Sequence, residues 1–388
     1  MKILHCCLAS FYIDDYSYQE NVLPKLHKQL GHEVMILAST ETYMSNRKLG
    51  YISPSTYFSK DGIEVKRIPY VSWLPMKLAV KIRKYVGVLS IINDFKPDLI
   101  FLHDTQTYST REIARYLKQN KNVKLVVDCH ADYINSARGW VSKHLLHKIY
   151  YKWCAKQIIP FIDKFYGTLP IRINFPVEMY GIPKERTSLL PFGIDPTNFD
   201  ISKREEVRKE IRTQWNIQES DFVIIAGGKI DKKKNIHLLV ESIINLKNEN
   251  VKLFLFGEPV SDFKKEFSEL TAKCKGLCNI GWIDSKETYK YFVASDLVVF
   301  PGTHSVLWEE TIGLGLPGIF KKWDGMDHVD LGGNVIMLED VSVDVLYSKL
   351  HTILNDSNVY ASMLKCARDP NNMNKFNYLD IARRSIEF

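Results

Sequence analysis

The sequence predicts an α/β protein with two doubly wound, Rossmann-like domains that face one another across a cleft. Short apolar strand patterns alternate with helical patterns through the first half of the chain, which is typical of a mostly parallel sheet covered by helices. The turn-rich segment Leu190–Phe199 interrupts this alternation, which restarts at Phe222. A chain of 388 residues is also long enough for two domains.

The first domain is expected to span residues 1–195. Its opening unit is a buried strand at Lys2–Leu8, a helix at Tyr18–Leu30 that Gly31 ends, and a strand at Val34–Ala38. Further patterns continue the alternation and predict strands at 62–68, 99–102, 123–127, 163–167 and 187–190, and helices at 76–95, 110–119 and 140–160.

The second domain is expected to span residues 196–375, and a C-terminal helical segment at 376–388 is expected to return to the first domain. A charged helix at 203–215 opens the second domain. The following patterns predict strands at 222–226, 252–256, 278–281, 297–300 and 318–320, and helices at 235–246, 264–274, 285–294, 309–314 and 378–386.

Composition excludes several classes of protein. Apolar residues make up 45% and charged residues 25% of the chain, as in folded domains and unlike disordered chains. No apolar run reaches the roughly 18 residues that a membrane-spanning helix needs. The N-terminal apolar run is too short for a signal peptide, so we expect a cytoplasmic protein. The seven Cys residues lack zinc-type spacing and are interpreted as reduced, buried thiols.

The net charge of +7 is unevenly distributed. Residues 1–195 contain 27 Lys and Arg against 17 Asp and Glu, whereas the remainder contains 25 against 28. The basic half suits an anionic membrane surface, on which the predicted basic helix at 76–95 would rest. A Lys-rich surface that is simply solvated is the alternative. We expect no nucleic-acid partner.

A basic turn after the first strand of the second domain predicts an anion site. Gly227 and Gly228 follow the strand, and Lys229 and Lys232–Lys234 precede a helix. Glycine lets a ligand approach the backbone, and the first turn of a helix offers free N–H groups. A diphosphate is therefore the expected ligand, and a solvated basic turn is the alternative. The turn matches neither the P-loop pattern nor the dinucleotide-binding GxGxxG pattern.

Other candidate residues also follow strands. Glu309 and Glu310 stand at a helix start, where one carboxylate could accept two ribose hydroxyls or both could simply complement the helix dipole. His103 and His130 follow two strands of the first domain, without the spacing of a metal-binding HExxH motif. The acidic residues around His328 are expected to be solvated rather than to hold a metal.

Taken in order, these segments resemble the retaining glycosyltransferases of the GT-B fold, in the large family four that uses nucleotide-sugar donors. Gly228–Asn235 is similar to the family's Gly-Arg-Leu-x-x-x-Lys-Gly motif, and Glu310–Pro317 is similar to its Glu-Ala-Met-Ala-x-Gly-x-Pro motif. The other segments that carry the resemblance are Met1–Leu4 with Gly31–Val34, Leu190–Asp195 and Tyr378–Ile386.

The resemblance implies roles for individual residues. Lys229 and Lys234, beside Gly228, would contact the donor diphosphate, and Glu310 would accept the ribose hydroxyls. His130 is similar to the histidine that the first domain presents to the donor sugar. The nucleotide base would face Gly281, Trp282 and Ile283, and the donor side would include His304 and Ser305. The acceptor side would include Tyr16, Ser17, Tyr18, Gln19 and Asp132.

Three departures from the family pattern stand out. Gly302 occupies the position of a Glu that contacts the donor sugar, so His304 is the candidate for that contact. The segment Tyr16–Asn21 replaces a glycine pair and would line the acceptor side. Lys229 stands where the family usually has Arg, and an ammonium group offers a point charge instead of a planar fork.

The resemblance implies transfer of a hexose from a UDP- or GDP-linked sugar to a hydroxyl group, with retained anomeric configuration and with no metal or other cofactor. Fixed positive charge would stabilise the leaving diphosphate. The acceptor would be lipid-linked or a glycan in surface polysaccharide or glycoconjugate biosynthesis, with the protein peripheral at the inner face of the membrane. The alternatives are a nucleotide-sugar epimerase of the same fold and a non-catalytic partner subunit, which the missing Glu favours.

Overall fold

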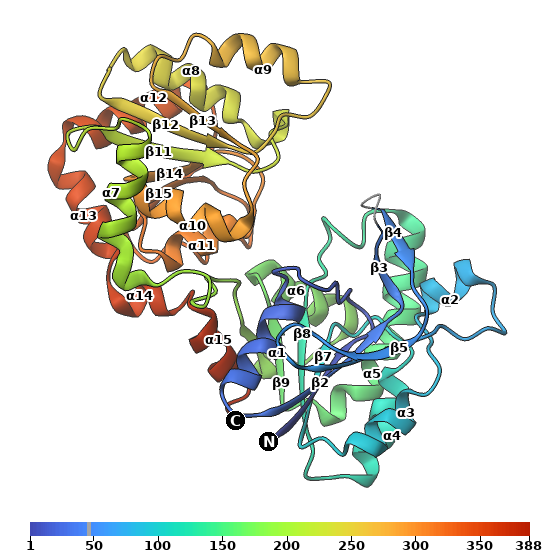
Figure 1. The fold of residues 1–388 in the computed structure, drawn as a ribbon. Coiled ribbons are helices and arrows are strands. Elements are labelled where there is room, and N and C mark those ends of the chain that lie inside the picture. Colours follow the sequence, from blue (N-terminus) through green and yellow to red (C-terminus); the bar gives the residue numbers. More distant parts are fainter. Residues whose placement is uncertain (45–47) are drawn as a thin grey trace. The chain divides into compact units, whose positions relative to one another are not determined.

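The computed structural model describes residues 1–44 and 48–388, which form two compact units (Figure 1). The first comprises Met1–Pro191 with Ile381–Phe388, and the second comprises Phe192–Asp380. Each contains one large sheet, so the expected fold class of two Rossmann-like domains is confirmed. Residues near Ile194 belong to the second unit because the Ile194 N–H donates to the Phe376 carbonyl and the Ile194 carbonyl accepts from the Tyr378 N–H.

An eight-stranded sheet forms the first unit, in the order β10-β9-β8-β7-β1-β2-β6-β5. Neighbouring strands are parallel except β5 and β6, and β3 pairs with β4 in a separate antiparallel sheet. The strands are β1 (Lys2–Cys7), β2 (Glu33–Ser39), β3 (Glu41–Tyr43), β4 (Leu49–Tyr51), β5 (Ser55–Phe58), β6 (Glu64–Ile68), β7 (Leu99–His103), β8 (Lys124–Cys129), β9 (Lys164–Gly167) and β10 (Thr187–Leu189).

Helices pack on both faces of this sheet (Figure 1). They are α1 (Gln19–Gln29), α2 (Met76–Ile82), α3 (Val88–Phe95), α4 (Thr110–Gln119), the π-helix η1 (Ser142–Tyr151), α5 (Lys152–Ile158), α6 (Pro170–Tyr180), the 3-10 turns η2 (Ile159–Phe161) and η3 (Lys184–Arg186), and the end of α15 (Tyr378–Ser385).

The alternation of side chains along the strands separates two kinds of environment in the first unit. Leu4 and Cys6 of β1 join the main apolar core on one face of the sheet. Successive side chains of a strand point to opposite faces, so the neighbouring His5 points to the other face, where its ring contacts His27 of α1. Histidine and carboxylate side chains on that second face form the cluster described below.

The second unit contains a six-stranded parallel sheet in the order β13-β12-β11-β14-β15-β16. This is the doubly wound order in which the chain moves outward from the centre in both directions. The strands are β11 (Phe222–Gly227), β12 (Val251–Phe256), β13 (Leu277–Gly281), β14 (Leu297–Phe300), β15 (Gly318–Lys321) and β16 (Val335–Leu338).

Two apolar cores lie on the two faces of the second sheet. The helices α7, α10 and α11 cover one face and α8, α9 and α12 cover the other (Figure 1). The helices and turns of this unit are η4 (Ile201–Lys203), α7 (Arg204–Gln214), η5 (Lys232–Lys234), α8 (Ile236–Leu246), α9 (Lys264–Thr271), α10 (Ser285–Ala294), α11 (Leu307–Gly313), α12 (Val343–Asn355), α13 (Ser357–Ala367) and α14 (Pro370–Asn374).

The prediction of one basic helix at 76–95 is wrong. The segment forms two helices, α2 and α3, with a break between them. Arg83 adopts a left-handed backbone conformation with φ of 52°, and Gly87 does the same with φ of 84°. The break buries Tyr85, whose hydroxyl donates to the Leu8 carbonyl, and Tyr85 also forms a β-bridge to Tyr70. Burial of this aromatic side chain favours the break over a continuous helix.

The seven cysteines are free, and five of them are buried, in agreement with the expected thiols. The described part of the chain contains no helix that is long and apolar enough to cross a membrane.

Candidate active site

The predicted donor residues lie where the order of the second sheet reverses. The connection after β11 leads to β12 on one side, and the connection after β14 leads to β15 on the other. In doubly wound sheets, ligands bind at the carboxyl ends of the strands beside such a reversal. Lys229 and Lys234 follow β11, and His304 and Ser305 follow β14.

Lys234 joins the two loops. Its Nζ atom donates to the Thr303 carbonyl at 2.8 Å, and burial lowers the pKa of this half-buried amine. The next residue, Asn235, donates from its amide group to the Pro301 carbonyl at 3.0 Å. Lys229 is exposed. A small pocket at this junction is lined by Gly227, Lys234, Ile236, Phe300, Pro301, Gly302, Thr303, Ser305 and Trp308.

The packing of these loops explains why Gly302 replaces the family's Glu. A Cβ atom on Gly302 would lie 2.4 Å from the Cα of Lys234 and 2.5 Å from the Lys233 carbonyl oxygen. Both contacts are with backbone, which a small side-chain rotation cannot relieve. No side chain fits at this position unless the two loops separate.

Replacing Gly302 with alanine is expected to destabilise the protein by about 1–3 kcal/mol, the usual range for overpacking, and to weaken donor binding through displacement of Lys234. Chemical denaturation and nucleotide titration measure the two effects. Gly139→Ala is the matched control, because a Cβ at that position has no neighbour within 4 Å. Equal behaviour of the two variants would contradict the loop packing.

Glu309 and Glu310 occupy different environments in α11. The Oε1 atom of Glu309 lies 2.9 Å from the Nε2 atom of His304 and 2.9 Å from the Nε2 atom of His328. Burial opposes the charge on Glu309, but the two imidazoles outweigh it and lower its pKa to about 2. Burial and the neighbouring Glu309 raise the pKa of Glu310 to about 8. Glu310 is therefore a neutral acid near pH 7.

The role of His328 as a partner of Glu309 was not predicted from the sequence, which placed it in a solvated acidic cluster. His304 and Glu309 are five residues apart in the sequence, but nothing in the sequence connects His328, which follows the next strand, to either of them. His304 remains beside Lys234, since its carbonyl lies 3.5 Å from the Lys234 Nζ. Its contact with the donor sugar stays a prediction.

Glu310 makes stability depend on pH. Its pKa of about 8 lies above the ordinary value of about 4.5, so the folded protein holds an extra proton between these pH values. The contribution of Glu310 to the free energy of unfolding therefore falls as pH rises from about 4.5 to about 8. In the wild-type protein this fall in the free energy of unfolding is on the order of a few kcal/mol. Replacement of Glu310 by glutamine is expected to reduce it. Denaturation of both proteins at pH 5 and pH 8.5 measures the difference, and parallel curves would contradict the assignment.

The residues that are predicted to face the nucleotide base lie at the end of β13 and directly after it. Three glycines close this edge of the sheet: Gly228, Gly257 and Gly281, with φ angles of 99°, 94° and 74°. The Gly257 N–H donates to the Gly281 carbonyl at 2.7 Å. A Cβ on Gly257 would lie 1.9 Å from the Gly228 carbonyl oxygen. Trp282 is 71% exposed, and Ile283 packs against the core.

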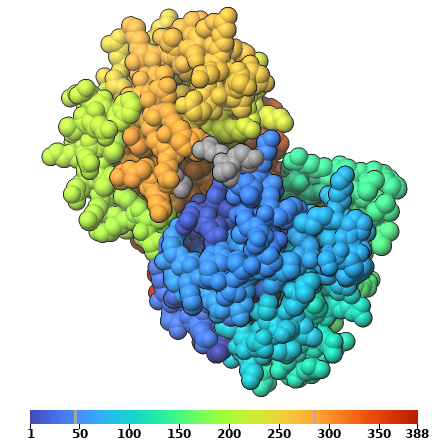
Figure 2. Space-filling model, turned by 45° about the vertical axis from the view of Figure 1, so that its right-hand side comes forward, coloured from blue at the N-terminus to red at the C-terminus, as the bar shows by residue number. Residues whose placement is uncertain are grey.

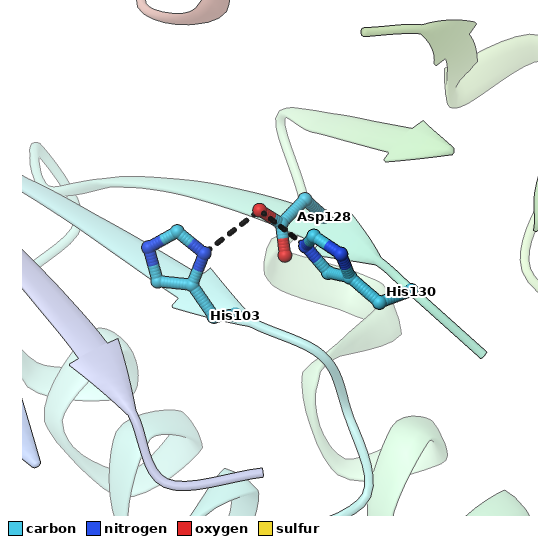
Figure 3. A group of neighbouring side chains, drawn as sticks. All are labelled: His103, Asp128 and His130. Carbon is cyan, nitrogen blue, oxygen red and sulfur yellow. Dashed lines mark hydrogen bonds and ion pairs between the residues drawn. The ribbon is translucent and has the colours of Figure 1, made fainter. Parts of the chain in front are cut away.

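In the first unit, His103, Asp128 and His130 lie together at the carboxyl ends of β7 and β8 (Figure 3). His103 Nδ1 donates to Asp128 Oδ2 at 2.7 Å, and His130 Nε2 lies 3.4 Å from the same oxygen. Glu20 of α1 approaches His130 Nε2 at 3.9 Å. Two carboxylates therefore face the imidazole that was assigned to the donor sugar.

Electrostatics favour a charged His130 and a charged Asp128. Burial opposes the charge on His130, but Glu20 and Asp128 outweigh it and raise its pKa to about 9. Burial would raise the pKa of Asp128, but the His103 and His130 imidazoles hold it well below its usual value. At neutral pH the pair is therefore an imidazolium and a carboxylate.

A chain of buried histidines extends from Asp128 across the sheet. His103 Nε2 lies 3.0 Å from His5 Nδ1, and His5 Nε2 lies 3.0 Å from His27 Nδ1. His27 Nε2 in turn lies 3.0 Å from the Ser385 hydroxyl. Burial lowers the pKa of His27 to about 3 and that of His5 well below its usual value, so both rings are neutral. No local pattern in the sequence predicted this chain beyond His103.

His103, Asp128 and His130 form a trio of metal-ligating type in the described part of the chain (Figure 3). The atoms that they could offer to a metal ion all lie within 4.8 Å of one another. Imidazole and carboxylate are ligands that zinc accepts. The 2.7 Å separation of His103 Nδ1 and Asp128 Oδ2 is that of a hydrogen bond. We therefore interpret the trio as a hydrogen-bonded network, and the absence of a metal requirement stays a prediction.

The predicted acceptor-side residues separate into exposed and buried groups. Tyr16, Ser17 and Tyr18 are exposed, and the Tyr16 ring contacts the rings of Tyr18 and Tyr43. Asp132 is buried and ion-paired with Arg172 at 3.1 Å, and it accepts from the Ile134 and Asn135 N–H groups. These bonds give Asp132 a structural role in its turn.

Several buried polar atoms at this edge of the first sheet have no hydrogen-bond partner among the described residues. They include both amide atoms of Gln19, the Thr105 hydroxyl and Asp128 Oδ1. Gln19 begins α1, Thr105 follows β7, and Asp128 lies near the end of β8. A buried polar group without a partner is costly, so these atoms are candidates for contact with a polar ligand.

The two parallel sheets, each with a polar cluster at its carboxyl edge, agree with the GT-B fold that the sequence motifs predicted. Residues 207–316 match the family model described as "Glycosyl transferases group 1", and residues 20–198 match "Glycosyltransferase Family 4". Together the two matches cover most of the chain. The chain belongs to the family-four glycosyltransferases of the GT-B fold, as the sequence motifs predicted.

Individual relatives agree with this assignment. An uncharacterized glycosyltransferase of Methanocaldococcus jannaschii is 22% identical over 314 residues, which cover 77% of this chain and 74% of that protein. Alpha-monoglucosyldiacylglycerol synthase of Streptococcus pneumoniae is 21% identical over 303 residues, which cover 76% of this chain and 65% of that protein. The solved structure of Anabaena HepE in complex with UDP matches with a TM-score of 0.67 and 14% identity, over 99% of this chain and 98% of that one.

Proposed function

We propose that this glycosyltransferase moves a hexose from a nucleotide diphosphate sugar to a hydroxyl acceptor, with retention of the anomeric configuration and without a metal ion. The observation that carries the proposal is the half-buried Lys234 amine in the pocket between the β11 and β14 loops. A cation held in a partly dry site stabilises charge that develops on a leaving diphosphate. The UDP in the similar Anabaena structure supports a nucleotide donor.

In this proposal, Lys234 and the exposed Lys229 contact the diphosphate. The neutral acid of Glu310 contacts the ribose, because a protonated carboxyl group can donate one hydrogen bond and accept others. Glu309 is not assigned to the substrate, since its Oε1 atom is bound by His304 and His328. Gly281, Trp282 and Ile283 remain assigned to the base, and Ser305 to the donor side.

His130 is assigned to the donor sugar, with Asp128 and Glu20 keeping its imidazole charged. A cationic imidazole donates hydrogen bonds from both nitrogens, which suits sugar hydroxyls. We assign no carboxylate as nucleophile, because Asp128 is fully buried and bound to His103. The leaving phosphate is then the group that takes the acceptor proton.

The acceptor is proposed to be a lipid-linked intermediate or a glycan hydroxyl. Support comes from the unpartnered polar atoms of Gln19 and Thr105 at the edge of the first sheet. The exposed aromatic side chains of Tyr16 and Tyr18 offer flat apolar surfaces on which a sugar ring can stack. The Streptococcus pneumoniae relative is named for a glycolipid product, which supports an acceptor on lipid.

A thermal-shift screen across UDP- and GDP-linked sugars tests the donor, because a ligand that binds the folded state raises its melting temperature. The donor that stabilises the protein is then incubated alone and with glycan or lipid acceptors, and the products are followed by NMR. We expect a new glycosidic bond of the donor's anomeric configuration. An isomerised donor would identify an epimerase, and no binding of any nucleotide sugar would identify a non-catalytic subunit.

A further inference from the structure

We infer that Glu309 and His328 are positioning residues of the donor site, which hold the imidazole of His304 so that its Nδ1 atom contacts a hydroxyl group of the donor sugar. The inference rests on the proposed function, because it requires a nucleotide sugar at the pocket between the β11 and β14 loops. The sequence predicts only the contact of His304 with the sugar, and the structure adds the two residues that fix its ring. Glu309 and His328 act through His304 and touch no part of the donor.

The carboxylate of Glu309 decides which nitrogen of His304 carries a hydrogen. The Oε1 atom of Glu309 lies 2.9 Å from the Nε2 atom of His304, and an ionised carboxylate can only accept hydrogen bonds. The Nε2 atom of His304 is therefore a donor. Its Nδ1 atom makes no hydrogen bond within the described residues and is not one of their buried unpartnered atoms, so it is open to solvent. Nδ1 is thus the ring nitrogen that a ligand can reach.

His328 in turn holds Glu309. Its Nε2 atom lies 2.9 Å from the same Oε1 atom, and it donates to this oxygen for the same reason. The Oε2 atom of Glu309 and the Nδ1 atom of His328 are buried and have no hydrogen-bond partner among the described residues. Within the described part of the chain, the two imidazoles alone therefore hold the carboxylate, and its orientation depends on both of them.

Aromatic packing keeps the His304 ring beside the pocket. The centroids of the His304 and Trp308 rings are 5.0 Å apart, with the rings edge to face. Trp308 is fully buried and stacks on Phe320 at 4.7 Å. Trp308 also lines the pocket, together with Thr303 and Ser305, the two sequence neighbours of His304. The ring is therefore held in advance at the border of the pocket, and a ring that is already ordered loses little entropy when a ligand binds.

The loop that carries His328 is also joined to the β14 loop by a second contact. The Trp323 indole N–H donates to the Gly302 carbonyl at 3.0 Å, and both Trp323 and His328 follow β15. Figure 2 shows orange, the colour of the chain around residue 300, at the surface of the second unit, and Val306 in this part of the chain is 38% exposed. The β14 loop is thus supported by the loop after β15 and is also accessible from solvent.

A sugar hydroxyl suits the open Nδ1 atom of His304. A hydroxyl group can both donate and accept, so it pairs with a neutral ring, whose Nδ1 accepts, and with a charged ring, whose Nδ1 donates. The His304 carbonyl lies 3.5 Å from Lys234 Nζ, the amine that is proposed to contact the diphosphate. The sugar of a nucleotide sugar is joined directly to the diphosphate, so its hydroxyls lie within reach of residues that border the diphosphate.

Calorimetric titration of the full chain with a nucleotide sugar and with its parent nucleotide tests the inference. The nucleotide sugar is the one among UDP-glucose, UDP-galactose, UDP-N-acetylglucosamine and GDP-mannose that gives the largest thermal shift, and UDP or GDP is the reference. The dissociation constant of the nucleotide sugar divided by that of the nucleotide isolates the contribution of the sugar. His304→Ala is expected to raise this ratio by about five- to tenfold, the usual effect of one lost hydrogen bond, and to change binding of the nucleotide itself by less than about twofold.

Variants of the two positioning residues are expected to act through His304. Glu309→Gln and His328→Leu should each raise the ratio by about threefold or more, because they release the His304 ring without removing it. His328→Gln keeps an N–H donor and is expected to restore most of the sugar binding. Glu309→Gln combined with His304→Ala is expected to raise the ratio no further than His304→Ala alone, because residues that act through one group are not additive.

Nitrogen chemical shifts of the histidine rings, measured by NMR, provide a readout that does not depend on affinity. We expect a hydrogen on Nε2 of His304 in the wild-type protein and a partial loss of it in Glu309→Gln. Asp296→Asn is the matched control, because Asp296 is also a carboxylate held by two cationic groups, Arg208 and Arg212, but it precedes β14 at the amino end of the strand. A purely structural ion-pair network loses stability when it is broken, and Asp296→Asn is expected to do so with an unchanged ratio.

The possible outcomes separate this inference from the proposed function. An unchanged ratio in His304→Ala or in both Glu309→Gln and His328→Leu, an equal rise in Asp296→Asn, or a His304 ring without hydrogen on Nε2 would overturn the inference and leave the donor site standing. If Glu309→Gln does not fold, the difference between His328→Leu and His328→Gln decides the question. A wild-type protein that binds no nucleotide or nucleotide sugar would overturn the proposed function, and the inference with it.

Discussion

Replacing Lys234 with alanine is expected to lower kcat/KM for transfer by about 10² to 10³, the usual loss when one preorganised donor to a developing negative charge is removed. Lys234 is the half-buried cation of the β11–β14 pocket, and its amine already lies within hydrogen-bonding distance of the Thr303 carbonyl. Steady-state kinetics with the donor identified by thermal shift measure the loss. Lys234→Arg is expected to restore part of the activity through its retained charge.

Lys233→Ala is the matched control, because Lys233 is the adjacent lysine and its side chain is exposed. It is expected to change kcat/KM less than about threefold, since exposed charges contribute little. Denaturation midpoints of both variants separate a lost phosphate contact from a loosened loop. A Lys234→Ala protein that keeps its activity, or a Lys233→Ala protein that loses as much, would remove the basis of the proposed donor site.

Replacing Asp128 with asparagine is expected to lower kcat at pH 7.5 by about tenfold, because an imidazole with the ordinary pKa of about 6.5 is charged in only about a tenth of the molecules at that pH. Wild-type His130, with a pKa of about 9, is charged at neutral pH and loses its charge as pH rises through 9. Without the Asp128 charge, this pKa falls toward the ordinary value of about 6.5. The alkaline limb of the pH–rate profile is therefore expected to move to lower pH.

Asp132→Asn is the control for this second prediction. Asp132 is also a buried carboxylate beside His130 in sequence, but its partners are Arg172 and the turn backbone. It is expected to lower stability while leaving the alkaline limb in place. Because removal of a buried charge can impair folding, Glu20→Gln provides a milder variant that is expected to move the limb in the same direction. An unmoved limb in both Asp128→Asn and Glu20→Gln would contradict the role of His130.

The predicted elements agree with the structure where apolar periodicity is strong. The strands at 99–102 and 222–226 and the helix at 110–119 coincide with β7, β11 and α4 to within a residue or two. The short strands β3, β4 and β5 at residues 41–58 were not predicted, because they are three or four residues long and largely exposed, so they lack an apolar pattern. The helix α6 was also not predicted, because Pro176 inside it is a residue that normally ends a helix.

The candidate site could be predicted only in part. Glycine and lysine after β11 and the acids of α11 are local signals, and they led to Lys234 and Glu310. Partners from distant segments have no local signal: Glu309 is bound by His328, and Asp128 is bound by His103, 25 residues earlier in the chain. The histidine chain joins His5 and His27 to Ser385, 358 residues beyond His27. Such contacts depend on which strands become neighbours.

The sequence by itself determined the two-sheet fold, the family and the basic turn at β11, because each follows from periodicity or from residues close together in the chain. The tertiary structure alone decided which carboxylates are charged, why Gly302 has no side chain, and that α2 and α3 are separate helices. Those properties arise from burial and from contacts between segments far apart in sequence. Charge states in particular depend on desolvation and on neighbouring charges, and neither exists before the chain has folded.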